Sequence, residues 1–534
     1  MKRISSTANS LAINFGKENL YPVISAVAII GLWIMVTVGF SKMHIFPVFH
    51  DSPLFHYMAQ QILDGSVPYR DFFDMNLPGI YFIHMIVLLL FGKSDTGWTM
   101  FTMLWLVLTA LVAAKFCWRI SRLAAILIAA LIISLVLRMG VYSFGQRDFF
   151  MMLFLLLAMD QFAQFLEGVP GQRVQSSGKF LSGSGLAMGA AMSIKPVPIV
   201  LLAGFLGIIF LRPFLQKRDG QAPLSKRDTA ILLNVVIRQA LLLCSGSIVI
   251  PAVFAIWLLF TGGLEPFFEI MLQYILPIYS GLNRQDMQIL LRKLFTALQP
   301  IWVNIPFLLF GLITIRGKLL TTRLWLADMA FLYGCCHFLL QGKGWDYQAM
   351  PFLMTSLLLQ TVIFGVFMQK KLVFQSMGLL WVLTVVLING SGLMNLAPIS
   401  NQPLSDLKPA VPLLVDDLRS LGSSSTDRVQ VMDVTGGGIH ALFLLGQRLS
   451  TRYIYDFPLI NNTDTQYVQK MQKEIIANLT NSQPIWIVVF AEGWEQQDLG
   501  LQRFKDFPQF IEFLNNHYHP AVEHQFYTIY QRNP

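Results

Sequence analysis

The sequence predicts an α-helical integral membrane protein of about eleven transmembrane helices that ends in a small α/β domain. Of its 534 residues, 54% are hydrophobic and only 13% are charged, whereas soluble domains carry about 25% charged residues. Long apolar segments, each close to the roughly 20 residues that a spanning helix needs, follow one another as far as Gly392. Beyond Gly392 the chain becomes polar and proline-rich, and shorter segments replace the apolar runs.

The expected spanning helices are joined by short loops. One apolar run is interrupted by Lys195-Pro196, and because proline disfavours helix continuation this run predicts two short helices. The segment Ile80–Phe91 has only about a dozen residues, which suits a re-entrant or interfacial helix better than a span. The predicted spans are Tyr21–Ser41, Trp98–Phe116, Ala124–Met139, Phe149–Leu166, the two halves of Ser184–Leu211, Ile231–Phe260, Ile301–Ile315, Leu324–Leu340, Phe352–Met368 and Leu372–Ile388.

Basic loops set the expected orientation, because Lys and Arg are enriched on the cytoplasmic side. The most basic loop, Arg212–Asp228, is placed inside, which puts the loop 42–79 and the C-terminal domain outside. The basic residues from Arg284 to Lys293 fall on an outer segment and are an exception. These loops account for the net charge of +9, so no nucleic-acid partner is expected. We expect a transmembrane domain over residues 1–392, and a linker with an extracytoplasmic domain over 393–534.

The C-terminal segment has the pattern of an α/β domain. The stretches RVQVMDV and PIWIVVF predict buried strands, and HQFYTIYQR predicts a final strand. The stretches YVQKMQKEIIANL and FPQFIEFLNNH predict helices. None of the four cysteines has the spacing of metal ligands, so all four are expected to be packing residues.

The acidic loop after the first helix holds the sharpest catalytic candidate. Asp51 stands in HDSP, just past the outer end of that helix. A general base must lie near the proton that it removes, and a carboxylate at the membrane surface can serve. The alternative is helix capping, because an Asp followed by Ser52-Pro53 and a periodic apolar segment is a capping signature. The residues alone leave both alternatives open.

Two further acids lie in the same loop, in RDFFDMNLPG. Asp71 and Asp74 are candidates for orienting an acceptor or holding a metal, and turn formation before Pro-Gly is the alternative. In the next outer loop, Arg147 and Asp148 suit a structural ion pair as well as a phosphate contact.

Two more candidates lie at outer helix ends. Lys195 interrupts an apolar run, and an ionisable residue there is a functional hypothesis by default, with snorkelling to the interface as the alternative. The stretch GKGWDYQAMP holds Lys343, a candidate for neutralising a lipid phosphate. It also holds Trp345 and Tyr347, which are candidates for contacting a sugar or a polyprenyl chain, or else members of an aromatic belt.

In order and topology these motifs resemble the GT-C superfamily of polyprenyl-phosphate-sugar glycosyltransferases over nearly the whole chain. The likeness is closest to bacterial members related to the aminoarabinose lipid A transferase and the protein O-mannosyltransferases. Many relatives have an acid at the position of Ser52 and often a His at that of Gln348, and the lipid A branch has a Lys at that of Met75. The resemblance rests on Asp51, ILDGSVPYRDFFDMNLPGIY, LFG at Leu90–Gly92, GQRD at Gly145–Asp148, the run into Lys195-Pro196, QGKGWDY at Gln341–Tyr347, and Thr451-Arg452-Tyr453.

The resemblance implies an inverting transferase with Asp51 as the base and Asp74 as a second acid. It implies a sugar donor linked to polyprenyl phosphate, and a hydroxyl acceptor on a glycan, lipid or protein of the cell envelope. The site of transfer is expected at the outer face of a bacterial inner membrane. No cofactor is required by this chemistry, although a divalent metal is an open alternative. The rival functions are a transporter or flippase of lipid-linked sugars, and a non-catalytic envelope assembly protein. The expected substrate-binding residues are Arg70, Asp71, Arg147, Asp148, Lys195, Lys343, Trp345, Tyr347 and Arg452.

Overall fold

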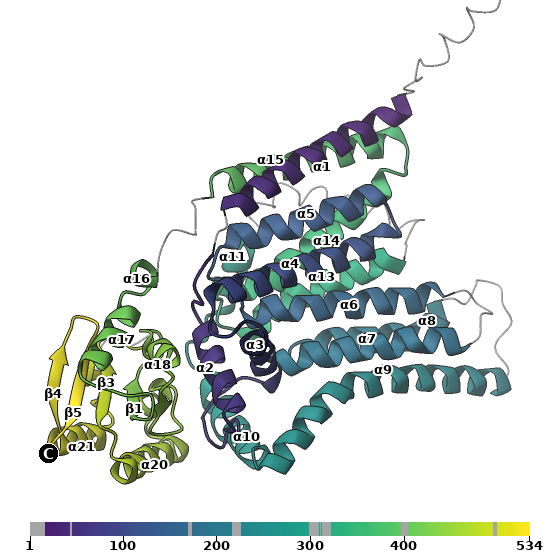
Figure 1. Ribbon diagram of the computed structural model, residues 1–534. Coiled ribbons are helices and arrows are strands. Elements are labelled where there is room, and N and C mark those ends of the chain that lie inside the picture. The colour runs from purple at the N-terminus through teal and green to yellow at the C-terminus, as the bar shows by residue number, and fades with distance from the viewer. Residues whose placement is uncertain are drawn as a thin grey trace, which may run out of the picture.

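The computed structural model describes residues 17–42, 45–168, 174–215, 226–297, 322–396, 404–494 and 499–534, together with Leu309 and Gly311. The predicted span Ile301–Ile315, apart from those two residues, the centre of the basic loop and part of the linker lie outside the described residues. Figure 1 shows a bundle of long helices with an α/β unit at one end and the short helices α2 and α3 between the two.

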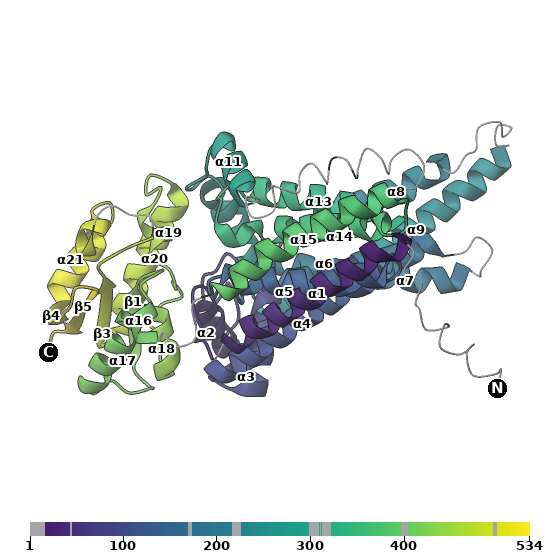
Figure 2. The same cartoon turned by 90° about the horizontal axis from the view of Figure 1, so that it is seen from above.

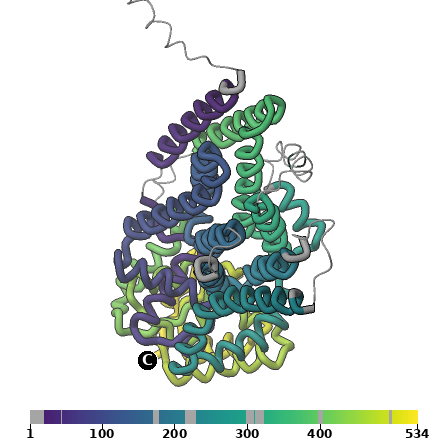
Figure 3. Tube along the Cα trace, turned by 90° about the vertical axis from the view of Figure 1, so that its right-hand side faces the viewer, coloured from purple at the N-terminus to yellow at the C-terminus, as the bar shows by residue number. Residues whose placement is uncertain are grey.

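Eight helices in the described part of the chain are long and apolar enough to cross a membrane. They run side by side along the bundle, which Figure 2 shows from above and Figure 3 shows from one end. Helix α14 is the most enclosed of them, because all of its residues are buried. The eight helices are α1 (Lys17–Lys42), α4 (Asp95–Trp118), α5 (Arg122–Met139), α6 (Arg147–Glu167), α9 (Lys226–Thr261), α13 (Thr322–Gln341), α14 (Met350–Phe367) and α15 (Leu372–Met394).

The apolar run with an internal proline forms two helices, as predicted: α7 (Val174–Ile194) and α8 (Ile199–Leu215). Helix α7 packs closely against α9 through small residues. A Cβ added to Gly185 would lie 2.3 Å from the carbonyl oxygen of Leu243. Glycine therefore lets the two backbones approach each other, as it does in many pairs of membrane helices.

Two segments that the sequence predicts to be outer segments lie at the end of the bundle that faces the α/β unit. The first holds α2 (Ser52–Leu63) and α3 (Pro78–Phe91). With 14 residues, α3 is about 21 Å long, which is shorter than the roughly 30 Å hydrocarbon core. The second holds α10 (Leu264–Ile270), the π-helix η1 (Met271–Tyr279) and α11 (Met287–Ala297).

The α/β unit is built on a five-stranded sheet of order β2-β1-β3-β5-β4. Strand β1 is parallel to both of its neighbours, with Val429 opposite Trp486 of β3, whereas β5 is antiparallel to β3 and β4. The three predicted strands are confirmed as β1, β3 and β5, and β2 and β4 were not predicted. The strands are β1 (Arg428–Met432), β2 (Arg448–Leu449), β3 (Trp486–Phe490), β4 (Tyr518–Glu523) and β5 (Tyr527–Arg532).

The helices of this unit include the two that the sequence predicts, α20 and α21. Direct hydrogen bonds join the unit to the first outer segment. The Phe73 amide donates to the Arg452 carbonyl at 2.7 Å, and the Leu449 amide donates to the Tyr57 hydroxyl at 2.9 Å. The helices are α16 (Leu404–Leu407), α17 (Ala410–Ser420), α18 (Gly438–Leu445), α19 (Phe457–Ile460), α20 (Gln466–Ser482) and α21 (Pro508–His517), with the 3-10 helix η5 (Gly500–Phe504).

Candidate active site

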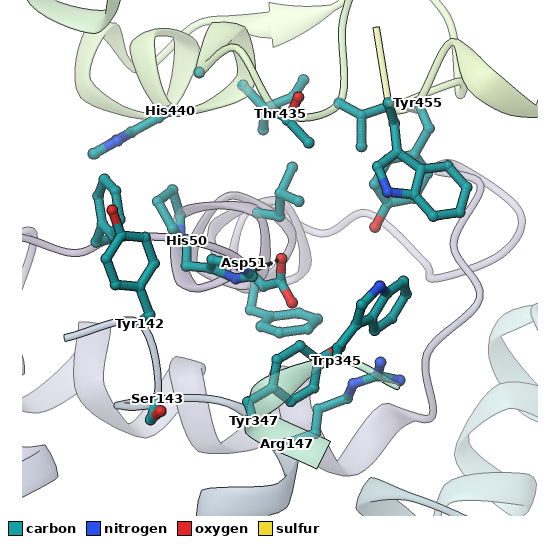
Figure 4. A pocket seen from close by; sticks show the side chains of 18 of the residues that line it. His50, Asp51, Tyr142, Ser143, Arg147, Trp345, Tyr347, Thr435, His440 and Tyr455 are labelled. Atoms are coloured by element: carbon teal, nitrogen blue, oxygen red, sulfur yellow. Dashed lines mark ion pairs between the residues drawn. The ribbon is translucent and has the colours of Figure 1, made fainter. Parts of the chain in front are cut away.

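A cavity of about 900 Å³ lies between the ends of the membrane helices and the α/β unit. The loop before α2, the start of α6 and the 3-10 helix η3 (Asp346–Ala349) supply its inner wall, and the α/β unit supplies its outer wall. The side chains therefore come from segments far apart in the sequence. Figure 4 shows ten of them: His50, Asp51, Tyr142, Ser143, Arg147, Trp345, Tyr347, Thr435, His440 and Tyr455.

Asp51 occupies the N-cap position of α2, but its side chain makes no capping hydrogen bond. Its carboxylate lies instead in the cavity wall, with Oδ1 3.1 Å from Nδ1 of His50 and 31% of the side chain exposed. The helix begins without this cap because Pro53 fixes the backbone of the first turn. The capping alternative therefore does not explain where the carboxylate points.

His50 is held in an unusual backbone conformation beside this acid. Its φ of 59° lies in the left-handed region, which is uncommon for a residue other than glycine. Its Nδ1 also lies 2.8 Å from the amide nitrogen of Gln146. Backbone strain of this kind costs about 1–3 kcal/mol and persists only where the surroundings enforce it. Here it places an imidazole against the Asp51 carboxylate.

The surroundings favour the ionised form of Asp51. Burial raises the pKa of its carboxyl, but the hydrogen bond and charge of His50, with Arg147 and Gln146, bring this pKa below its ordinary value. For His50, burial lowers the pKa, and the hydrogen bond and charge of Asp51 raise it above its usual value overall. Asp51 is therefore a carboxylate at neutral pH, as a general base must be.

Arg147 begins α6 and faces the same cavity. Its Nε is buried and makes no hydrogen bond within the described residues. The adjacent acid, Asp148, is not its ion-pair partner, because successive residues on a helix point about 100° apart and Asp148 bonds inside the bundle. The guanidinium is thus positioned to bind an anion that enters the cavity.

Asp148, Lys195 and His337 form a buried polar network behind the cavity. Lys195 Nζ and His337 Nε2 each lie 2.6 Å from a different oxygen of Asp148. The Asp148 and His337 side chains are fully buried, and that of Lys195 is 5% exposed. Lys195 also bonds to Gln341, and its Nζ lies 5.8 Å from the centre of the Tyr347 ring. This network joins α6, α13 and the break between α7 and α8 directly beneath the cavity.

Asp74 is buried outside the cavity, although its neighbours Met75 and Asn76 line it. Its oxygens accept hydrogen bonds from the Asn76 amide nitrogens at 3.0–3.2 Å, from the Tyr455 hydroxyl at 2.7 Å and from the Tyr81 hydroxyl. With both oxygens occupied, Asp74 fixes the loop against the α/β unit.

Neither a protein-family model nor a curated protein sequence matches this chain. Solved structures do. ArnT from Cupriavidus metallidurans, bound to undecaprenyl phosphate, aligns with a TM-score of 0.60 and 12% identity over 95% of this chain and 97% of that one. Its apo form aligns with a TM-score of 0.60 and 10% identity. The oligosaccharyltransferase of Archaeoglobus fulgidus, tethered to an acceptor peptide, aligns with a TM-score of 0.52 and 10% identity over 95% of this chain and 74% of that one.

The chain has the GT-C fold. This confirms the predicted helical membrane fold with a small C-terminal sheet unit, and with the eight apolar helices it makes the chain a multi-pass membrane protein. The count of about eleven spans stays a prediction. Within the described residues, no cluster of three or more His, Cys, Asp or Glu side chains is arranged to hold a metal ion.

The remaining predicted site residues lie outside the cavity wall. Lys343 donates to the carbonyls of Tyr279 and Leu282. Arg70 and Asp71 pair with each other at 2.7 Å on the surface. Arg452 pairs with Glu474 at 2.8 Å. Of the predicted site residues, the structure brings four together in the wall: Asp51, Arg147, Trp345 and Tyr347.

Sequence reasoning missed several residues of this region. His50 carried a signal, since it directly precedes Asp51. His337 carried another, because an ionisable residue within an apolar helix is a functional hypothesis by default. The outer wall, with His440, Tyr455 and Trp494, carried no signal, because these residues reach the cavity only through the packing of the α/β unit.

Proposed function

We propose that the GT-C chain is an inverting glycosyltransferase that moves a sugar from polyprenyl phosphate to an acceptor hydroxyl. The observation that carries the proposal is the pairing of Asp51 and Arg147 in one cavity. The Asp51 carboxylate makes no capping hydrogen bond, so it can act as the base that this transfer needs. The Arg147 guanidinium lines the same cavity and can stabilise the charge that develops on the phosphate. The GT-C fold supports the proposal, and ArnT was solved with undecaprenyl phosphate.

In the proposed reaction, the acceptor hydroxyl oxygen attacks C1 of the donor sugar while Asp51 takes the hydroxyl proton. The bond between C1 and the phosphate oxygen breaks, and its electron pair leaves with polyprenyl phosphate. Arg147 stabilises the negative charge that develops on the phosphate. Attack opposite the leaving group inverts the configuration at C1. The reaction needs no oxidant and no second nucleophile.

The proposed place of transfer is the outer face of a bacterial inner membrane, with the α/β unit outside. The donor lipid is expected to enter from the bilayer beside the helix ends, so that its phosphate reaches Arg147. The acceptor is expected to be a hydroxyl of an envelope glycan, lipid or protein. We assign Asp74 the role of a positioning residue, because its carboxylate is already satisfied by Asn76, Tyr81 and Tyr455.

Replacement of Asp51 by Asn tests the proposal. The substitution keeps the size of the side chain and removes its basicity, so the rate of transfer should fall by about 100-fold or more. The thermal stability should change little, because the side chain makes no capping hydrogen bond and its ion pair with His50 is partly exposed. The assay measures transfer by the purified full-length protein from an undecaprenyl-phosphate-linked sugar to envelope extract.

The matched control is Asp64→Asn at the other end of α2, where the acid is exposed and pairs loosely with Arg448 at 3.6 Å. This variant should transfer at the wild-type rate. Transfer by Asp51→Asn within a few-fold of the wild type would eliminate Asp51 as the base. Mass spectrometry of envelope glycans from cells with and without the gene identifies the product.

A further inference from the structure

The sheet of the α/β unit presents a crevice toward Asp51. Strands β1 and β3 are parallel neighbours, with β2 on the far side of β1 and β5 on the far side of β3. The chain leaving β1 therefore runs to one side of the sheet, and the chain leaving β3 runs to the other. In open α/β sheets, ligands bind outside the carboxyl ends of the strands at such a switch point.

The loops at this switch point line the catalytic cavity. Val434 and Thr435 follow β1, and Trp494 follows β3. His440, on the helix after β1, lines the same wall. Figure 4 shows Thr435, His440 and Tyr455 across the cavity from Asp51. The loops after β1 and β3, where such a sheet binds its ligand, therefore form the outer wall of the cavity that holds Asp51.

The crevice is not built for a phosphate. A glycine-rich turn between a strand and a helix often binds phosphate with its backbone N–H groups. Here the amides of Gly436, Gly437 and Gly438 all donate to the carboxylate of Asp433, at 2.7–2.8 Å. The chain's own acid therefore occupies the anion position, and a second anion would be repelled.

Lys408 also lines this wall, and its ammonium donates to the carbonyl of Thr435. The other groups suit a neutral, hydroxyl-rich ligand with apolar C–H faces. Trp494 lies against Phe457 at 4.7 Å and near Trp345 at 6.2 Å between ring centres, so aromatic rings from both halves of the molecule meet here. Thr435 is exposed. Burial, followed by the charges of His56 and Lys408, lowers the pKa of His440 to about 3, so this imidazole is neutral and can exchange hydrogen bonds with hydroxyl groups. Aromatic walls with a few polar groups are typical of small-ligand sites.

We infer that the crevice between the loops after β1 and β3 binds the acceptor, and that the acceptor is a saccharide whose hydroxyl is held toward Asp51. The inference rests on the proposed glycosyl transfer and specifies its acceptor class. The acceptor, rather than the donor, occupies this wall because the donor lipid comes from the bilayer, on the side of the helix ends. The α/β unit forms the wall farthest from those helices (Figure 1).

The test measures binding of two probes to the full-length protein in detergent by calorimetry. One probe is the oligosaccharide pool released by mild acid from envelopes of source cells that lack the gene, in which unmodified acceptors accumulate. The other is undecaprenyl phosphate. Trp494→Ala should raise the dissociation constant for the oligosaccharides about tenfold. Thr435→Val, which keeps the shape of the side chain, should raise it about threefold. Both variants should bind undecaprenyl phosphate as the wild type does.

The matched control is Trp118→Ala, because Trp118 is half-exposed at the far end of α4. This variant should leave both dissociation constants unchanged. Absence of oligosaccharide binding to the wild type, with undecaprenyl phosphate still bound, would overturn the acceptor site and leave the transferase proposal standing. Equal weakening of both probes by Trp494→Ala, or no effect of either wall variant, would also overturn it. If Asp51→Asn instead transferred at the wild-type rate, Asp51 would be rejected as the base, whereas the binding measurements would still decide the acceptor site.

Discussion

Replacement of Lys195 by Met tests whether the buried network beneath the cavity is a structural ion pair. Lys195 Nζ lies 2.6 Å from Asp148, and their side chains are 5% and 0% exposed. Without the lysine, the carboxylate keeps the hydrogen bond from His337 but loses its ammonium partner. Breaking a buried pair by removing one member costs about 3–5 kcal/mol. Because His337 still donates, we expect the free energy of unfolding to fall by about 3 kcal/mol, at the lower end of this range.

The chain offers a control with the same geometry on its surface. Lys470 Nζ also lies 2.6 Å from a carboxylate, that of Glu269, but these side chains are 59% and 25% exposed. Exposed pairs contribute less than about 1 kcal/mol, because water solvates both charges and side-chain entropy opposes the pairing. Lys470→Met should therefore destabilise the protein far less than Lys195→Met, and the difference measures the effect of burial.

The assay is thermal and denaturant unfolding of the purified variants in one detergent. The double variant Lys195→Met with Asp148→Asn should recover most of the loss, because it leaves no uncompensated charge in the bundle. The reasoning fails if Lys195→Met is within about 0.5 kcal/mol of Lys470→Met, since that difference is no larger than ordinary surface effects. It also fails if the losses of the two single variants simply add in the double variant, because partners in contact are expected to couple.

The remaining predictions concern protonation and topology. His50→Gln removes the group that holds the pKa of Asp51 down. Since the base acts only when deprotonated, the acid limb of the pH profile of kcat/KM should move to higher pH in this variant. An acid limb that does not move would show that His50 does not hold down the pKa of Asp51. Thr426 is exposed on the α/β unit, and Arg119 is exposed beyond the inner end of α4. On a background without the native cysteines, a membrane-impermeant thiol reagent should label Thr426→Cys in cells with an intact inner membrane. Arg119→Cys should be labelled only after permeabilisation, and the reverse pattern would invert the topology.

The fold could be predicted from local sequence because each element is determined by nearby residues. Apolar runs long enough to span a bilayer must form helices there, since the bilayer core offers no water to unpaired backbone groups. Proline ended α7 near the position that the sequence indicated. Strands β1 and β3 appear as short runs of β-branched and apolar residues. Strand β4 has no such run and was not predicted, and Tyr518 is its one buried residue.

The candidate site could be predicted only in part, because the sequence indicates which residues are ionisable but not which way they point. Asp51 and Asp74 lie in the same acidic segment, 42–79. Asp74 is occupied by the Tyr455 hydroxyl, 381 residues away in sequence. Lys195 was expected to bind substrate, but its partner in the structure is Asp148 from another helix. No local pattern reports such pairings.

By itself the sequence determined that this is a membrane protein and which segments form its helices. It also determined that an acidic loop and a polar domain lie outside those helices. Hydrophobicity, helix length and proline act over a few residues, so they can be read in order along the chain. Only the tertiary structure decided that Asp51 and Arg147 line the same cavity and that the α/β unit closes its outer side. The physical reason is that the orientation of a charged side chain is set by the partners that compete for it, and here those partners come from distant helices and loops.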